Sequence, residues 1–356
     1  MTNSHFENPR RREFLRSLSA GALSLALSGR SVFAADKPGA RQLRGVFPIG
    51  LTPVTQDDKL DLEDLAAEVK FCNRGGVHGF VWPQIASGWS TLTEKERLDG
   101  AEAILAAGKG GKTALVIGVQ GPDMDTVTRY AKHAEKLGAD AIVSLPPQGV
   151  TDEKALVDYY QQVGRLTALP LFVQSQGSMS VDGIVEMFNS IPTMRQVKDE
   201  AGDPLQRISQ LRQRTNDQLK VFSGNGVRTM ITEMELGFSG HCPYPTLGDV
   251  YAAAYDLWHA GKKLEAFDMF GRIQAIGTMG PVTGHDVLIA RGVFKPGARA
   301  RRGAPAAAGS DLPTGGRGGM GGRGGGGGGA RGGGRPWGIK EIRDALDTYL
   351  KPYLRG

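Results

Sequence analysis

The chain has 356 residues and a formal charge of +6, from 43 lysines and arginines against 37 aspartates and glutamates. Residues 1–34 hold five arginines and two glutamates (+3), and residues 297–338 hold seven arginines and one aspartate (+6). The rest of the chain therefore carries −3, and this mildly acidic body argues against a basic nucleic-acid-binding domain. Without the two stretches 280 residues remain, a length that suits one large α/β domain.

Residues 1–34 have the features of an export signal. The pair Arg11-Arg12 precedes an apolar run over residues 18–27, and small residues permit cleavage after Ala34. A membrane anchor is the alternative, but it needs about 20 apolar residues, and this run is shorter and contains serines. The pattern predicts transport by the twin-arginine export machinery and a periplasmic or otherwise extracytoplasmic location.

Eight short apolar runs alternate with amphipathic stretches from residue 45 onward. The runs cover residues 46–51, 79–82, 114–119, 141–145, 169–173, 194–197, 219–222 and 240–242. The helical patterns between them cover residues 61–73, 93–107, 125–137, 152–167, 181–189, 203–214 and 227–236. This alternation predicts parallel strands joined by helical crossovers, and eight such units predict a closed (β/α)8 TIM barrel in the α/β class, with additional C-terminal helices. A doubly wound open sheet is the alternative, but no glycine-rich phosphate loop follows the first run.

The chain after residue 34 divides into three segments. The barrel and its first C-terminal helices are expected over residues 35–296, a Gly/Arg-rich insertion over 297–338, and a last helix packed on the barrel over 339–356. The insertion holds 19 of the 52 glycines, which predicts a flexible loop. Its Arg-Gly-Gly repeats could bind nucleic acid, but they lack aromatic residues that stack on bases, so we expect no nucleic-acid partner; weak contact with anionic envelope polymers is an alternative.

The two cysteines are expected at opposite ends of the barrel. Cys72 lies near the end of the first helical stretch, and Cys242 closes the last strand. We therefore expect no disulfide between them.

Active sites of such barrels lie at the C-terminal ends of the strands. The candidate residues at these ends, in chain order, are Thr52, Gln84, Ser87, Gln120, Gln148, Gln174, Lys198, Asn225, His241, Cys242 and Tyr244. Lys198 is unusual, since it ends a strand and is expected to point into the barrel mouth. Burial there would lower the pKa of its amine toward ~7–8, and a neutral amine can form a Schiff base with a carbonyl. The alternative is a surface lysine that pairs with Asp199 or Glu200.

Several segments resemble the dihydrodipicolinate synthase and N-acetylneuraminate lyase superfamily of class I aldolases. The matching segments are residues 50–54 (GLTPV), 75–81 (GGVHGFV), 91–97 (TLTEKER), 138–141 (GADA) and 197–203 (VKDEAGD). The resemblance extends from about residue 45 to 276, resumes at residue 335, and implies a barrel, often a homo-oligomer (tetramer or dimer). It also implies that Lys198 corresponds to the Schiff-base lysine.

The chain departs from this family at the proton-transfer positions. The family motif Gly-Thr-Thr-Gly-Glu is replaced by residues 84–88 (QIASG), the catalytic tyrosine falls at Gln148 or Gly149, and no arginine matches the one that binds a second carboxylate. Either His241 or Tyr244 has taken over proton transfer, or the barrel retains a pocket with little catalysis. General acid–base catalysis contributes about 10²–10⁴-fold, so its loss would nearly silence the reaction.

The polar residues around the predicted mouth favour a hydroxyl-rich ligand. Glutamine amides and the indoles of Trp82 and Trp89 suit sugars or sugar acids, although the tryptophans could equally serve packing. Thr52, Gln84, Ser87, Gln148, Gln174 and Cys242 are the expected substrate-binding residues. The six histidines are scattered, so we expect no metal and no other cofactor. We predict a lyase or aldolase that acts on a small-molecule 2-oxo acid or sugar-acid-derived substrate through Lys198; the alternative is a catalytically weak or inactive barrel that binds a carbohydrate-like ligand.

Overall fold

The computed structural model describes residues 41–224, 227–277, 282–301 and 336–356. In these residues eight parallel strands form one sheet in the order β1-β8-β7-β6-β5-β4-β3-β2. The strands are β1 (Gly45–Val46), β2 (Gly79–Trp82), β3 (Ala114–Gly118), β4 (Ala141–Ser144), β5 (Leu171–Gln174), β6 (Met194–Asp199), β7 (Lys220–Ser223) and β8 (Gly240–His241). Just after β1, Ile49 bridges Val81 of β2 in parallel, and the Gly50 amide donates to the Val81 carbonyl at 2.9 Å. The sheet therefore closes on itself, and the predicted (β/α)8 barrel is confirmed.

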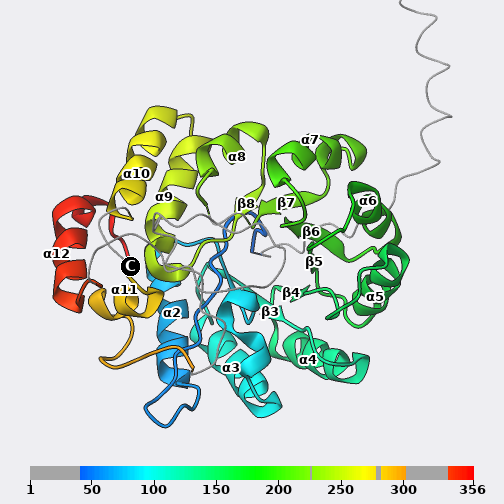
Figure 1. Cartoon of the computed structure of the whole chain (residues 1–356), viewed down its shortest axis with the longest axis horizontal. Coiled ribbons are helices and arrows are strands. Elements are labelled where there is room, and N and C mark those ends of the chain that lie inside the picture. The colour runs from blue at the N-terminus through cyan, green and yellow to red at the C-terminus, as the bar shows by residue number, and fades with distance from the viewer. Residues whose placement is uncertain (1–40, 225–226, 278–281, 302–335) are drawn as a thin grey trace, which may run out of the picture. The chain divides into compact units, whose positions relative to one another are not determined.

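Helices surround the strands on the outside of the barrel (Figure 1). Those that alternate with the strands are α2 (Leu62–Gly75), α3 (Glu94–Ala107), α4 (Met124–Leu137), α5 (Glu153–Arg165), α6 (Val181–Ser190), α7 (Pro204–Arg214), α8 (Met230–Leu236) and α9 (Gly248–His259). Beyond the barrel follow α10 (Lys263–Ile276), α11 (Gly284–Ala290) and α12 (Ile339–Tyr349). The additional C-terminal helices are thus present as predicted.

Polar caps fix where the helices begin. Asp61 accepts hydrogen bonds from two backbone amides at the start of α2, and Asp123 and Asp152 do the same for one amide each in α4 and α5. At α3, Thr93 and Glu96 form a reciprocal capping box. Such caps satisfy amides that have no partner within the helix. They explain why α2, α3, α4 and α5 start within one residue of the positions that the sequence pattern predicted.

Apolar side chains fill the interior of the barrel. Phe47, Phe172 and Phe222 form its largest group, with ring centroids 5.1–5.9 Å apart. Smaller residues from the other strands complete this cluster: Ile49, Val81, Ala114, Val116, Ala141, Val143 and Cys242. The interior is therefore a packed core rather than a pore, and space for a ligand exists only toward the strand ends.

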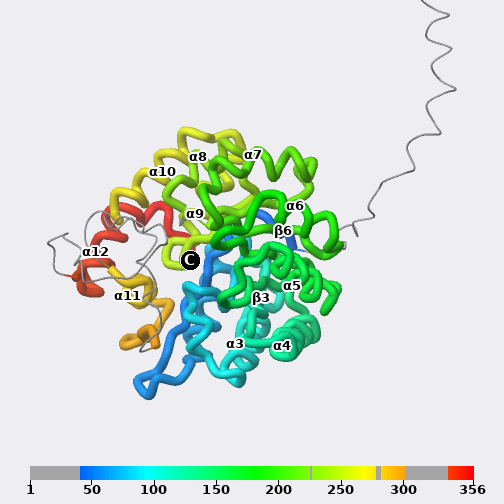
Figure 2. Tube along the Cα trace, turned by 45° about the vertical axis from the view of Figure 1, so that its right-hand side comes forward, coloured from blue at the N-terminus to red at the C-terminus, as the bar shows by residue number. Residues whose placement is uncertain are grey.

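The C-terminal helices pack together against one side of the barrel. Both views place α11 and α12 beside each other, with α10 nearby (Figures 1 and 2). Asp249 of α9 is fully buried, pairs with Arg291 at 2.7 Å and accepts the backbone amide of Gly356 at 3.0 Å. The last helix is shorter than the predicted 339–356 segment, because a 3-10 turn (Lys351–Tyr353) follows it.

Several predicted segments lie outside the described residues. They are the export signal, residues 1–34, and most of the Gly/Arg-rich insertion, residues 302–335. Cys72 and Cys242 are both buried, and neither forms a disulfide in the structure. None of the helices in the described ranges has the length and apolarity to cross a membrane.

Candidate active site

Lys198 lies inside the barrel near the end of β6. In a parallel ladder, register partners point to the same face, and the partners of Lys198 are Gln174 on β5 and Phe222 on β7. Phe222 belongs to the interior core, so Lys198 also faces inward. Its side chain is only 10% exposed. The structure thus shows a buried, inward-facing lysine at the C-terminal end of the strand.

The Lys198 ammonium is paired with the carboxylate of Glu200. Glu200 Oε1 lies 2.8 Å from Lys198 Nζ, and Glu200 Oε2 accepts a 2.6 Å hydrogen bond from the Gln174 amide. The Glu200 side chain is 24% exposed, so this ion pair is partly shielded from water. An opposite charge at this distance favours the ammonium form, which opposes the effect of burial. The neutral amine expected from the sequence therefore stays a prediction.

The turn after β6 is held from outside the barrel. The Ser175 hydroxyl donates to the Asp199 carboxylate and accepts the backbone amides of Glu200, at 3.0 Å, and Ala201, at 3.3 Å. Arg207 of α7 forms an ion pair with Asp199, with 3.1 Å between Nε and Oδ2. Burial raises the pKa of the Asp199 carboxyl although Ser175 and Arg207 act against it. These contacts fix the backbone from which Glu200 reaches Lys198.

Gly224 provides the space that Glu200 occupies. A Cβ at this position would lie 2.1 Å from Cγ and 2.3 Å from Oε1 of Glu200. Carbon atoms do not approach so closely, so a side chain at residue 224 would displace the carboxylate. The glycine that follows β7 therefore leaves the room in which the Lys198–Glu200 pair forms.

At the end of β2, two of the predicted binding residues serve the protein itself. The Ser87 hydroxyl donates to the Gly50 carbonyl at 2.6 Å and accepts the Gln84 backbone amide at 3.1 Å. The Thr52 hydroxyl donates to the Ser87 carbonyl at 2.6 Å and accepts the Trp82 indole at 3.0 Å. These bonds place Thr52 and Ser87 together at the mouth as supports of the loop.

Gln84 and Gln174 retain unused hydrogen-bonding capacity. Gln84 is 1% exposed, and among the described residues neither polar atom of its side-chain amide has a partner. The Oε1 atom of Gln174 is likewise buried without one. Buried polar atoms are normally bonded, so these two amides are the best candidates for ligand contacts.

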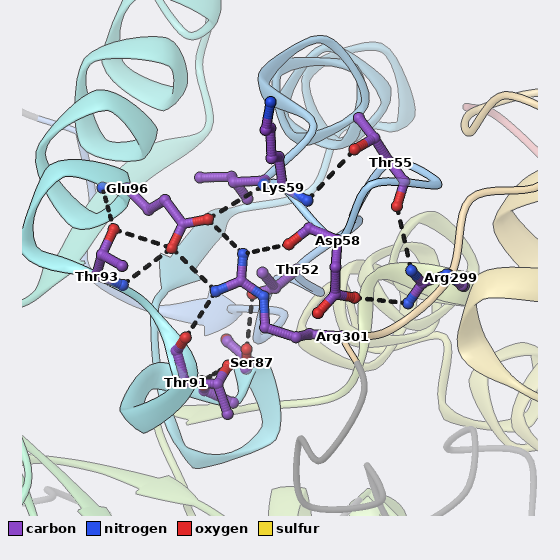
Figure 3. Close-up of polar contacts among 12 residues, drawn as sticks. Thr52, Thr55, Asp58, Lys59, Ser87, Thr91, Thr93, Glu96, Arg299 and Arg301 are labelled. Atoms are coloured by element: carbon purple, nitrogen blue, oxygen red, sulfur yellow. Dashed lines mark hydrogen bonds and ion pairs between the residues drawn. The ribbon is translucent and has the colours of Figure 1, made fainter.

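A pair of arginines ties the start of the Gly/Arg-rich segment to the loops at the mouth (Figure 3). Arg299 pairs with Asp58 at 2.7 Å, and the backbone carbonyl of Arg299 accepts the Val54 amide at 3.0 Å. Arg301 pairs with Glu96 and donates to the Thr91 carbonyl. Arg301 also lowers the pKa of Glu96 to about 2. Residues 297–301 are therefore held against the barrel, which corrects the expectation that the loop is flexible from residue 297 onward.

A cleft of about 820 Å³ opens at the same end of the barrel, beside Lys198 rather than around it. Three aromatic residues (Trp89, Tyr130, Tyr159) and three glutamines (Gln120, Gln148, Gln176) are among the residues that line it. Gln148 is exposed there, whereas Lys198 does not line the cleft. Trp82 faces away, since a Cβ on Gly100 of α3 would lie 2.4 Å from its ring, which matches the packing role considered for it. Among the predicted glutamines, Gln174 thus lies beside Lys198, whereas Gln120 and Gln148 line this cleft.

The structure places His241 on the other side of the barrel wall. Its register partner is Ser223, and its Nδ1 lies 2.7 Å from the Glu233 carboxylate of α8. The Tyr255 ring of α9 is 6.0 Å away. Burial alone would raise the pKa of Glu233, but hydrogen bonds from His241 and from the Ser223 and Thr229 hydroxyls outweigh it and lower that pKa. His241 thus lies between the strands and the outer helices. From the sequence it is a candidate group near the Lys198 amine, but the structure places it on the opposite face of the sheet.

Two further predicted residues, Cys242 and Tyr244, belong to the eighth unit. Cys242 belongs to the interior core cluster and is 9% exposed. Tyr244 is half-buried and precedes the 3-10 turn Pro245–Leu247. Asn225 lies outside the described residues.

From the sequence, Glu200 was considered only as an ion-pair partner of a surface Lys198. Strand alternation could have predicted its place in the site, because residues 198 and 200 are two positions apart and therefore point to the same face. No sequence signal pointed to Gly224, since its contact with Glu200 depends on the pairing of β6 with β7.

Fold and site together define a (β/α)8 barrel protein with a buried, carboxylate-paired lysine at its catalytic end. The family model of the Dihydrodipicolinate synthetase family matches residues 42–280, which is more than half of the chain. The chain therefore belongs to this family.

Individual relatives are distant. A 4-hydroxy-tetrahydrodipicolinate synthase of Methanosarcina mazei is 25% identical over 193 residues, which covers 52% of this chain and 65% of that protein. The N-acetylneuraminate lyase of Rhizobium meliloti is 26% identical over 269 residues, covering 74% and 85%. Among solved structures, the sialic acid aldolase of Ruminococcus gnavus superimposes with a TM-score of 0.69 at 19% identity, covering 87% and 99%, which shows the shared fold. The chain spans between about half and two thirds of several of the curated relatives it matches.

Proposed function

We propose that the chain is a lyase or aldolase that forms a Schiff base at Lys198 with a 2-oxo acid or a sugar-acid-derived substrate. The observation that carries this proposal is the buried, inward-facing amine at the end of β6 in a member of this family. A lysine in such a position can attack a carbonyl, and the resulting iminium acts as an electron sink for cleavage or formation of a carbon–carbon bond.

The glutamine amides at the strand ends favour hydrogen bonds to uncharged polar groups in the rest of the substrate. Gln84 and Gln174 have buried amide atoms without partners among the described residues. Neutral amides donate to and accept from hydroxyl groups, which suits a sugar-derived chain. Thr52 and Ser87 would contribute indirectly, because their hydroxyls hold the loop that carries Gln84.

Borohydride trapping tests the proposal. The protein is incubated with pyruvate and other 2-oxo acids, reduced, and weighed by intact mass spectrometry. We expect one adduct per chain, lost in Lys198→Ala. Lys154→Ala is the matched control, because Lys154 forms an exposed ion pair with Asp158 at 2.7 Å. Absence of an adduct with every 2-oxo acid would rule out the lyase.

A second candidate function is supported by the aromatic and glutamine-lined cleft. Its indole and amide side chains suit a carbohydrate ligand, and it does not require Lys198. Binding of a sugar panel measured by calorimetry, and unchanged by Lys198→Ala, would favour such a binding barrel over the enzyme. The enzyme predicts instead that a bound sugar acid loses affinity when Lys198 is removed.

The cellular setting belongs to the same proposal. Residues 1–34 would direct the protein through the twin-arginine machinery to an extracytoplasmic compartment, and the chain would assemble as a homodimer or homotetramer. Fractionation of cells that express the chain with Arg11 and Arg12 intact or changed to lysine tests export. Light scattering of the purified protein tests assembly.

A further inference from the structure

We propose that Glu200 is the acid–base residue of this site, exchanging protons with the Lys198 nitrogen and with the substrate carbon next to the iminium. The inference rests on the proposed Schiff-base function of Lys198. In the family, a tyrosine and the Gly-Thr-Thr-Gly-Glu motif serve proton transfer. This chain has Gln148 and residues 84–88 at those positions, so the assignment of Glu200 supplies the missing proton transfer.

Distance and orientation support this role. One Glu200 oxygen lies 2.8 Å from Lys198 Nζ, within the reach that direct proton transfer needs. The other oxygen is held at 2.6 Å by Gln174, whose strand neighbours β6. Ser175 anchors the Glu200 backbone amide, and Gly224 leaves the space for the side chain. Residues at the ends of β5, β6 and β7 thus hold the Glu200 carboxylate next to the Lys198 amine.

Four other polar groups near the mouth have partners within the protein. The hydroxyls of Thr52 and Ser87 donate to backbone carbonyls at 2.6 Å. The Tyr159 hydroxyl lies 2.7 Å from the Ser144 hydroxyl. Asp199 faces outward and is bound by Ser175 and Arg207. Among these groups and Glu200, only Glu200 contacts the lysine nitrogen.

The proton balance closes with these two residues and the substrate. Glu200 first takes a proton from the ammonium, and the freed amine attacks the carbonyl carbon, whose oxygen takes the proton from Glu200. Glu200 then removes a proton from the nitrogen of this adduct and returns it to the hydroxyl, which leaves as water and gives the iminium. The ionised carboxylate can now remove a proton from the adjacent carbon. The C–H electron pair forms the carbon–carbon double bond of the enamine, and the C=N π pair moves onto nitrogen.

Hydrogen–deuterium exchange and borohydride trapping are compared, because Glu200 transfers protons both in Schiff-base formation and at the adjacent carbon in this proposal. Pyruvate in D₂O is followed by proton NMR for exchange of its methyl hydrogens, and adducts are trapped with borohydride in parallel. In Glu200→Gln we expect exchange to slow by about 10²–10⁴-fold. Glu200→Asp should restore part of the rate, and it provides a second test if Glu200→Gln folds poorly.

The matched control is Glu63→Gln. Glu63 of α2 is exposed and forms an ion pair with Lys295 at 3.2 Å. Its replacement removes a carboxylate charge, as Glu200→Gln does, but at a position outside the site. This variant should exchange at the wild-type rate. If wild type and Glu200→Gln trap and exchange equally well with one pH profile, the role of Glu200 is wrong while Lys198 stands. If wild type traps no 2-oxo acid, both proposals fall.

Discussion

Replacing Gly224 by alanine tests whether the position of the Glu200 carboxylate matters. The new Cβ would lie 2.1 Å from Glu200 Cγ, whereas ordinary carbon contacts begin near 3.4 Å. The carboxylate must therefore retreat by about 1.3 Å, which lengthens the 2.8 Å separation from Lys198 Nζ to about 4 Å. At an effective dielectric constant of about 20, this weakens the attraction by about 2 kcal/mol. A catalytic group misplaced by about 1 Å can cost about 10²-fold in rate, so we expect methyl exchange to slow by up to this factor.

The assay is the methyl exchange of pyruvate in D₂O, with thermal unfolding as a check on folding. Gly271→Ala on α10 is the control, because a Cβ there meets nothing within 4 Å. In a Glu200→Ala background, Gly224→Ala should cause no further loss, since the displaced carboxylate is gone. A Gly224→Ala protein that is folded and exchanges at the wild-type rate would refute the reasoning.

Three further predictions concern stability. Phe222→Ala removes a ring from the aromatic core and should lower the free energy of unfolding in urea by about 3–5 kcal/mol; a loss below 1 kcal/mol would contradict that core. Burial lowers the pKa of His285 to about 4, so stability present above the ordinary value near 6.5 is lost as pH falls toward 4. The free energy of unfolding in urea falls from pH 7 to pH 5. This fall should be about 1–2 kcal/mol smaller in His285→Asn than in wild type, and an equal fall in both proteins would refute the reasoning. Arg301 lowers the pKa of Glu96 to about 2. The ion pair therefore stabilises the folded protein above about pH 4.5, and this stabilisation is lost as the pH falls toward 2. After allowance for partial exposure, Arg301→Met should cost about 1–2 kcal/mol at pH 7 and little at pH 2.5; an equal cost at both pH values would show that the ion pair is not responsible.

The barrel could be predicted from the sequence because each of its units is local. Eight apolar runs, each followed by an amphipathic stretch, require parallel crossovers, and the helix starts carry their own capping residues. Lys198 was predictable for the same reason, since its place at a strand end and its parity are properties of one strand.

Contacts between elements could not be predicted in this way. The outward direction of His241 follows from its pairing with Ser223 in a strand of two residues, too short for alternation to reveal. The space for Glu200 depends on Gly224 of a neighbouring unit, and the attachment of Arg299 to Asp58 joins residues 241 positions apart. Such features depend on register and long-range packing, which local sequence patterns do not encode.

Peptide mapping of the borohydride-reduced protein tests the central claim most directly. After incubation with a 2-oxo acid and reduction, the protein is digested and the peptides are sequenced by mass spectrometry. We predict that the added mass lies on Lys198 and that the digest lacks cleavage after this residue. An adduct confined to other lysines, or none with any 2-oxo acid while the protein is folded, would contradict the account.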